Sequence, residues 1–178
     1  MNCGELSDEE NGSITQMRGE RNETNGATRF HSGRGGSCKR RSRGDLIAAN
    51  SMILHEIYFD SLGGGATPAG ALAEAITRDF GSLDRWRTQF SAMGKAEGGG
   101  SGWVILSYSP RDKRLVNQWA ADHTTTLAGG RPVLVLDMYE HAYHMDYGAA
   151  AARYVDVFMD AIRWDNAVKL FERYSRES

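Results

Sequence analysis

The residues of this chain that could do chemistry gather in one stretch, residues 137–147, with the sequence DMYEHAYHMDY. Asp137 ends an apolar run, where a carboxylate is costly unless a partner offsets its charge. His141 follows one helical turn later, so its imidazole and the Asp137 carboxylate can reach a common point. An imidazole and a carboxylate together suit iron, manganese or zinc. The same spacing also fits an aspartate that caps the next helix beside a packed histidine, and spacing alone leaves both interpretations open.

His55 is a second candidate because of its place in a predicted helix, 46–62. Apolar residues recur there every three or four positions, so that His55 shares a face with Met52, Phe59 and Leu62. A single histidine on an apolar face is more often packed in a core than bound to a metal. The helix therefore makes His55 a candidate ligand only in combination with other evidence.

The elements that would position these residues run in the order helices, sheet, helices. We expect helices at 46–62, 68–80 and 82–96, strands at 103–107, 114–121 and 132–138, and closing helices at 147–162 and 164–174. Ser82 is well placed to cap the third helix, which would turn Trp86 and Phe90 inward. The continuous apolar run VLVL at 133–136 predicts a strand buried on both faces. This order predicts an α+β fold with a short three-stranded antiparallel sheet.

The first 45 residues have a different composition from the rest. They are rich in Gly, Ser, Asn, Arg and Glu and contain few large apolar side chains. Such a segment cannot bury enough surface to offset the entropy of ordering it. The basic run KRRSR at 39–43 could touch an anionic surface or nucleic acid, although a solvated tail is the plainer interpretation. We therefore expect a segment without a core, 1–45, followed by one domain, 46–178.

Composition narrows the classes of protein further. The chain has 178 residues and a formal net charge of −2, which suits one domain and gives no general argument for a nucleic-acid partner. No apolar run approaches the roughly 20 residues that span a bilayer, and the N-terminus lacks the pattern of a secretory signal. Cys3 and Cys38 fit reduced thiols better than a disulfide scaffold. We expect a cytoplasmic protein that binds neither nucleic acid nor membrane.

The run D-x-[aromatic]-E-H-A-Y at 137–143 resembles the signature of the iron/manganese superoxide dismutases. Segments 55–90, 100–106 and 154–171 are similar, in the same order, to other parts of that family. The resemblance implies the α+β fold of the family's C-terminal domain and one Fe or Mn ion per subunit. It also implies a homodimer that disproportionates superoxide to oxygen and hydrogen peroxide.

The same resemblance implies metal-site roles for four residues. It makes His55, Asp137 and His141 ligands of the metal ion. His123 falls near the place where the family has a group that hydrogen-bonds the metal-bound solvent, and such a group orients ligands and tunes redox potential. An ordinary exposed loop histidine is the alternative interpretation of His123.

Two other sets of residues match the family. Glu140 and Tyr143 match positions that reach across the dimer interface. Trp103, Tyr139 and Trp164 match the aromatic wall of the metal site, a role that is compatible with plain core packing.

The sequence departs from the family's pattern at its N-terminal end. The family takes its first histidine ligand and a gateway tyrosine from an N-terminal helix, and this sequence has no such helix. His31 lies upstream, in a Gly-rich stretch 24 residues before His55, and is a weak candidate for that ligand. Three explanations of this departure stay open. The N-terminal lobe is replaced, which leaves a three-ligand site like those of non-haem iron proteins and would also admit an oxygenase-like activity. Alternatively, the chain is a non-catalytic dimerising relative, or the first 45 residues come from a shifted reading frame.

Overall fold

The computed structural model describes residues 42–64 and 67–178, and these residues belong to one compact unit. Residues 1–41 lie outside the described part, and with them His31 and most of the segment predicted to lack a core, so the boundary at residue 45 stays a prediction. The predicted α+β order is confirmed. Its elements are α1 (Arg43–Asp60), α2 (Gly70–Phe80), α3 (Leu83–Ala96), β1 (Trp103–Ser109), β2 (Arg114–Ala120), β3 (Arg131–Asp137), α4 (Glu140–Tyr147), α5 (Ala151–Ala161) and α6 (Asp165–Arg176).

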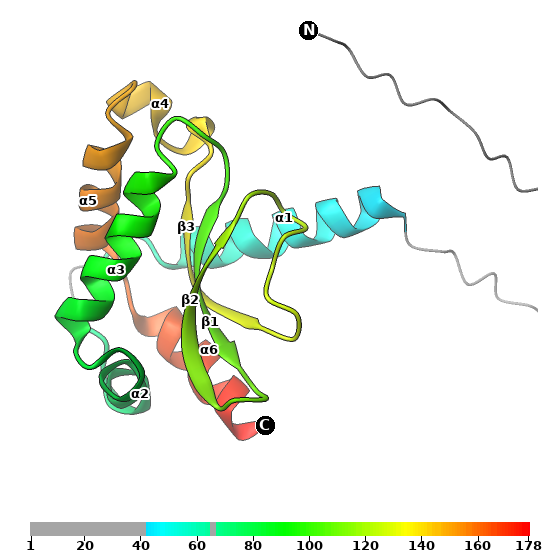
Figure 1. Cartoon of the computed structure of the whole chain (residues 1–178), viewed down its shortest axis with the longest axis vertical. Coiled ribbons are helices and arrows are strands. Elements are labelled where there is room, and N and C mark those ends of the chain that lie inside the picture. The colour runs from blue at the N-terminus through cyan, green and yellow to red at the C-terminus, as the bar shows by residue number, and fades with distance from the viewer. Residues whose placement is uncertain (1–41, 65–66) are drawn as a thin grey trace, which may run out of the picture. The chain divides into compact units, whose positions relative to one another are not determined.

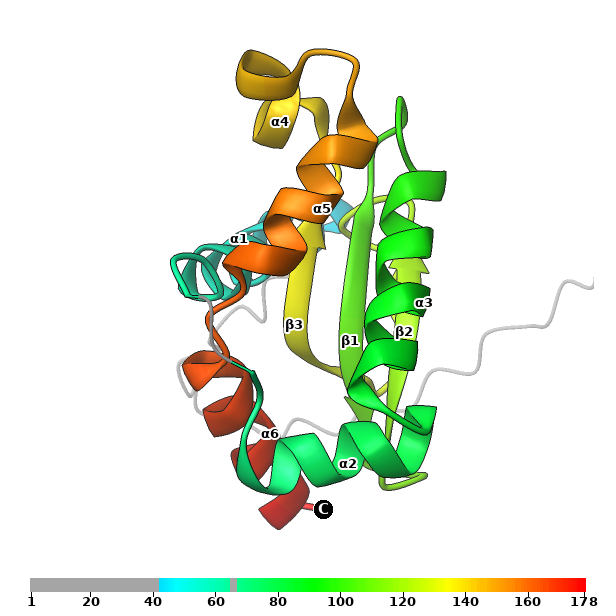
Figure 2. The same ribbon diagram turned by 90° about the vertical axis from the view of Figure 1, so that its left-hand side faces the viewer.

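The sheet has three antiparallel strands in the order β2-β1-β3, with β1 in the centre. Helices α3 and α5 lie side by side over one face, and α1 crosses the other face against β3 (Figures 1 and 2). The register pairs Trp103 of β1 with Asp137 of β3, which sets the end of β3 beside the start of β1. The candidate site lies at this end of the sheet, on the face that α1 crosses.

The core is built on the central strand and its neighbour. Every residue of β1 is buried, and residues 133–136 of β3 have no exposed surface, so the predicted burial of β3 on both faces is confirmed. Trp86 and Phe90 turn inward from α3 as predicted, and Ser82 caps that helix by accepting a hydrogen bond from the Arg85 amide. Each large apolar side chain buried in this way contributes about 1.5–3 kcal/mol.

Helix α1 departs from the prediction in its start and in its buried face. It begins at Arg43 rather than at residue 46, because Ser42 and Asp45 form a capping box. The face that contains Met52 and Phe59 is not the buried one, since those side chains are 57% and 64% exposed. The core contacts come instead from Leu54, Ile57 and Tyr58.

The predicted helix at 147–162 is present but starts later, as α5 at Ala151, because the chain breaks at Gly148. Gly148 has a φ of 54°, a conformation that glycine adopts without steric cost, and its amide donates to the His144 carbonyl. A separate helix, α4, precedes this break and α5 follows it. No helix in the described part of the chain has the length and apolar character needed to cross a membrane.

Candidate metal centre

Three side chains from separate elements converge at one end of the sheet. His55 comes from α1, Asp137 ends β3, and His141 lies in the first turn of α4. The Asp137 Oδ2 atom is 3.2 Å from His141 Nε2 and 3.5 Å from His55 Nε2, and the two Nε2 atoms are 3.4 Å apart. The three residues predicted as ligands are therefore brought together, and each turns one donor atom toward a common centre.

Local structure explains why Asp137 points as it does. The strand ends at Asp137, and the amide of Tyr139 donates to Asp137 Oδ1 at 2.9 Å. This hydrogen bond leaves Oδ2 to face the two imidazoles. The carboxylate is almost completely buried, and burial raises the pKa of the Asp137 carboxyl above its usual value. A buried carboxylate of this kind needs a positive partner.

The tautomer that the neutral His55 ring adopts bears on the nature of that partner. Its Nδ1 atom lies 2.7 Å from the Ser51 carbonyl oxygen, which can only accept, so Nδ1 carries the proton in the neutral ring. The Nε2 atom then presents a lone pair to the Asp137 carboxylate at 3.5 Å. Two acceptors that face each other at this distance repel unless a cation lies between them. The donor set thus fits a metal ion.

The size of the triangle fits the same conclusion. Nitrogen and oxygen ligands bind first-row metals at about 2.1 Å, so two ligands that subtend roughly 90–110° are separated by about 3.0–3.5 Å. The three distances of 3.2, 3.4 and 3.5 Å fall in this range. Two imidazoles and one carboxylate suit iron or manganese.

His123 lies beside the triangle. The Trp103 indole N–H donates to His123 Nδ1 at 3.0 Å, which leaves the proton of the neutral ring on Nε2. Burial and the neighbouring His55 lower the pKa of His123, so the neutral form is favoured. Its ring stacks on Tyr139 with centroids 5.1 Å apart and lies 6.1 Å from the ring of His55.

Two of the three residues predicted to form an aromatic wall lie beside the triangle. Trp103 meets the ring of His55 edge-on at 4.8 Å, and Tyr139 stacks on His141 at 5.5 Å. Trp164, by contrast, packs against Trp86 in the core. The Trp164 side chain therefore contacts α3, and the role predicted for it at the metal site stays a prediction.

The two residues predicted at a dimer interface differ in exposure. Glu140 is exposed at the start of α4. Tyr143 is buried within its own chain, with its ring 5.3 Å from that of Tyr154. Their role across an interface stays a prediction.

The sequence did not predict two tyrosines, Tyr58 and Tyr154, that are hydrogen-bonded to the backbone of Asp137 or to each other. The Tyr154 hydroxyl donates to the Asp137 carbonyl oxygen at 2.8 Å, and it lies 3.0 Å from the hydroxyl of Tyr58. The position of Tyr58, three residues after His55 in a helix, was a usable signal. Tyr154 gave none, because its partner is a backbone group.

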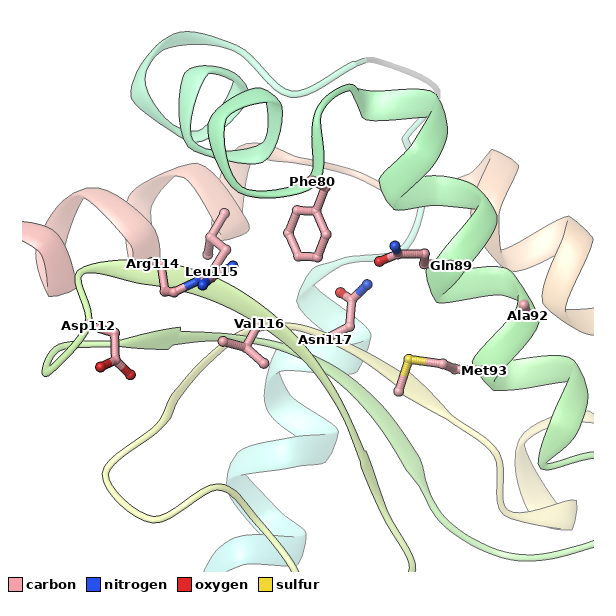
Figure 3. A pocket seen from close by; sticks show the side chains of 9 residues that line it. All are labelled: Phe80, Gln89, Ala92, Met93, Asp112, Arg114, Leu115, Val116 and Asn117. Atoms are coloured by element: carbon pink, nitrogen blue, oxygen red, sulfur yellow. The ribbon is translucent and has the colours of Figure 1, made fainter.

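A hollow of about 940 Å³ lies apart from the centre, between α3 and β2 (Figure 3). Phe80, Gln89 and Met93 line one side, and Leu115 and Asn117 of β2 line the other. None of its lining residues belongs to the triangle. The chemistry-bearing residues, and not this hollow, therefore define the candidate site.

Comparison with known proteins identifies the family. The family described as iron/manganese superoxide dismutases, C-terminal domain, matches residues 68–170. The Fe superoxide dismutase of Cupriavidus metallidurans is 67% identical over 135 residues, which cover 76% of this chain and 68% of that protein. Superoxide dismutase [Mn] 1 of Halobacterium salinarum is 39% identical over 124 residues, covering 68% of this chain and 60% of that protein. The Fe enzyme of Methanothermobacter thermautotrophicus is 39% identical over 126 residues, covering 67% and 60%.

The chain thus spans between 60% and 68% of the length of these three relatives. The matched segment of the family contains Asp137 and His141 together with the sheet that positions them. The chain belongs to the iron/manganese superoxide dismutase family.

Proposed function

We propose that this chain disproportionates superoxide to oxygen and hydrogen peroxide, with one iron or manganese ion per subunit held by His55, Asp137 and His141. The observation that carries the proposal is the triangle of donor atoms, 3.2–3.5 Å on a side, that two imidazoles form with a buried carboxylate. The 67% identity to the Fe superoxide dismutase of Cupriavidus metallidurans supports the assignment of this reaction to the triangle.

Iron or manganese, when bound, supplies the accessible +2 and +3 states that the two half-reactions need. The residues of the chain orient the site. The Ser51 carbonyl fixes the ring of His55 through Nδ1, and the Tyr139 amide fixes Asp137 through Oδ1. The negative charge of Asp137 favours the bound cation.

We assign His123 the role of a hydrogen-bond donor to the reacting species. Its Nδ1 is occupied by the Trp103 N–H, so Nε2–H is the group left to donate. Disproportionation takes up two protons for every two superoxide ions, and a fixed donor beside the centre helps to place a small anion or a solvent molecule. The side chains of His55 and His141 are 27% and 60% exposed, which leaves a route for a small anion to reach the centre.

We further propose a cytoplasmic homodimer without nucleic-acid or membrane partners. The exposed Glu140 would contact the second copy from the start of α4, and the buried Tyr143 would support that contact from inside the chain. The formal net charge of −2 supports the absence of a general nucleic-acid partner.

A second candidate function is that of a non-catalytic dimerising relative. Within residues 42–64 and 67–178, the cluster offers three ligand residues, His55, Asp137 and His141. The family resemblance implies one more histidine ligand. An impaired site with an intact fold is the specific alternative to an active one.

One set of measurements decides between the two candidates. The purified chain is assayed for bound iron and manganese and for superoxide consumption, beside Asp137→Asn and the control Asp146→Asn, which makes the same change at an exposed position of α4. We expect one metal equivalent and metal-dependent turnover in the parent and in Asp146→Asn, and neither in Asp137→Asn. A folded parent that fails to consume superoxide faster than the free metal ion would favour the non-catalytic candidate.

A further inference from the structure

Two buried tyrosines link the elements that carry the proposed ligands. Tyr58 of α1 and Tyr154 of α5 are 7% and 5% exposed, and their hydroxyl oxygens are 3.0 Å apart. The Tyr154 hydroxyl also lies 2.8 Å from the carbonyl oxygen of Asp137. A hydrogen-bonded chain thus runs from α1 through α5 to the last residue of β3.

The direction of each hydrogen bond in this chain is fixed. A carbonyl oxygen can only accept, so the single Tyr154 hydroxyl proton points to Asp137. The oxygen of Tyr154 must then accept from Tyr58. Burial raises the pKa of both tyrosines, which keeps both hydroxyl groups protonated. The order Tyr58 to Tyr154 to Asp137 follows, and hydrogen bonds in such a series strengthen one another.

The ring of Tyr154 adds a contact with the third ligand-bearing element. Tyr143 and Tyr147 of α4 pack on it, with centroids 5.3 and 5.9 Å from that of Tyr154. Tyr143 lies two residues after His141. Tyr154 therefore touches α1 through Tyr58, β3 through Asp137, and α4 through these two rings.

We propose that Tyr154, supported by Tyr58, is the positioning residue that sets the distances within the His55–Asp137–His141 triangle and thereby the affinity of the metal site. The inference rests on the proposed metal site and deepens it. The Tyr154 hydroxyl bonds to the backbone of Asp137 and to Tyr58, so both tyrosines act through the ligands. With Oδ1 of Asp137 held by the Tyr139 amide and its carbonyl held by Tyr154, Oδ2 is the one oxygen of Asp137 left for the ion.

Tyr154→Phe is the decisive substitution, because it removes the hydroxyl group and keeps the ring on which α4 packs. It leaves the Asp137 carbonyl without its donor and the Tyr58 hydroxyl without its acceptor. The control is Tyr108→Phe, the same change at another buried tyrosine, whose ring packs on Phe171 away from the triangle. Metal binding that changes in Tyr154→Phe but not in Tyr108→Phe separates an effect on the site from a general effect of removing a tyrosine hydroxyl from the core.

The probe is Co2+, whose visible absorption depends on ligand geometry, titrated into metal-free protein in competition with a chelator. We expect Tyr154→Phe to weaken Co2+ binding about 10- to 100-fold, as loss of an outer partner of a ligand does in other metal sites, and to change the shape of the absorption bands. Tyr108→Phe should match the parent in affinity and spectrum. Tyr58→Phe should weaken binding less, because Tyr154 still donates to Asp137. The double variant should match Tyr154→Phe alone within about twofold, because the two tyrosines act in series.

Co2+ affinity and spectrum in Tyr154→Phe that equal those of the parent would overturn the inference, whatever the change in unfolding free energy. Losses that simply add in the double variant would overturn the series arrangement. A parent that binds Co2+ but does not consume superoxide with iron or manganese refutes the proposed function alone, since the Co2+ comparison still judges Tyr154. A parent that binds no Co2+ refutes the inference together with the metal site.

Discussion

Asp137→Asn should change stability in opposite directions with and without metal. In the metal-free protein, Asp137 Oδ2 faces the Nε2 lone pair of His55 at 3.5 Å and lies 3.2 Å from His141 Nε2, so the buried carboxylate has a neutral histidine on each side and no fixed cation. Asparagine has nearly the same shape. Its oxygen can keep the hydrogen bond from the Tyr139 amide, while its Nδ2 places a donor where the carboxylate placed an acceptor. The substitution replaces a repulsive contact by a hydrogen bond and removes a buried charge.

The magnitude follows from the cost of a buried polar group without a partner. That cost is about 1–3 kcal/mol, and more for a charged group. We expect Asp137→Asn to raise the free energy of unfolding by about 1–3 kcal/mol in excess chelator at pH 8. Metal at 100 times its dissociation constant should stabilise the parent by about 2.7 kcal/mol. The variant lacks a charged ligand and should gain far less.

Urea unfolding followed by far-ultraviolet circular dichroism measures both effects, with Asp146→Asn as the matched control in α4. The control should unfold like the parent in chelator and in metal. If Asp137→Asn is less stable than the parent in chelator, the carboxylate has a positive partner within the protein itself. If it gains as much from Mn2+ as the parent does, Asp137 is not a ligand. Either result would refute the reasoning.

Three further predictions concern the scaffold. Asp79 accepts a hydrogen bond from the Leu115 amide at 2.7 Å. Burial opposes ionisation of Asp79, but hydrogen bonds from Arg78 and from this amide hold the pKa of its carboxyl below the usual 3.8. The stability that the ionised carboxylate contributes is complete above pH 3.8 and is lost as the pH falls through the lower pKa of the folded state, so parent and Asp79→Asn should differ in urea midpoint at pH 7 and converge in acid. Gly94→Ala would bring its Cβ within 2.8 Å of Leu136 Cδ2, and such overpacking should lower the free energy of unfolding by about 1–3 kcal/mol in chemical denaturation. Ser42→Ala removes the capping box of α1 and should cost about 0.5–2 kcal/mol, measured in the same way, with little effect on metal affinity.

The sequence predicts those parts of the fold that depend on local signals. Ser82 begins α3 because its hydroxyl accepts a hydrogen bond from the Arg85 amide, and the apolar run at 133–136 is buried on both faces as its composition indicates. The missed break at Gly148 has a physical reason, since the Ala-rich residues that follow it favour a helix and hide the positive φ of this glycine. Hydrophobic periodicity could not predict which face of α1 is buried, because apolar residues lie on both sides of that helix and Phe59 is left exposed.

The candidate site likewise contains residues that a local motif predicts and residues that only the fold brings together. Asp137 and His141 lie four residues apart, so one motif contains both. His55 joins them only because α1 packs across β3, a long-range contact that no local pattern encodes. The prediction that His55 binds the same metal ion as Asp137 and His141 came from the family resemblance. The hydrogen bond from Tyr154 to a backbone carbonyl leaves no mark in the sequence, and only the fold reveals it.

The restraints on the three ligands are unequal, and this inequality bears on how the site works. His55 is fixed through Nδ1 by the Ser51 carbonyl, and Asp137 is fixed by the Tyr139 amide and the Tyr154 hydroxyl. In the described part of the chain, no comparable hydrogen bond restrains His141 Nδ1; its ring stacks on Tyr139 and its side chain is 60% exposed. Two ligands therefore form a preorganised half of the centre, and His141 completes it from α4, next to the exposed Glu140. A second copy docked at Glu140 would cover His141 and restrict its ring, so the proposed dimer and the proposed metal site should stabilise each other.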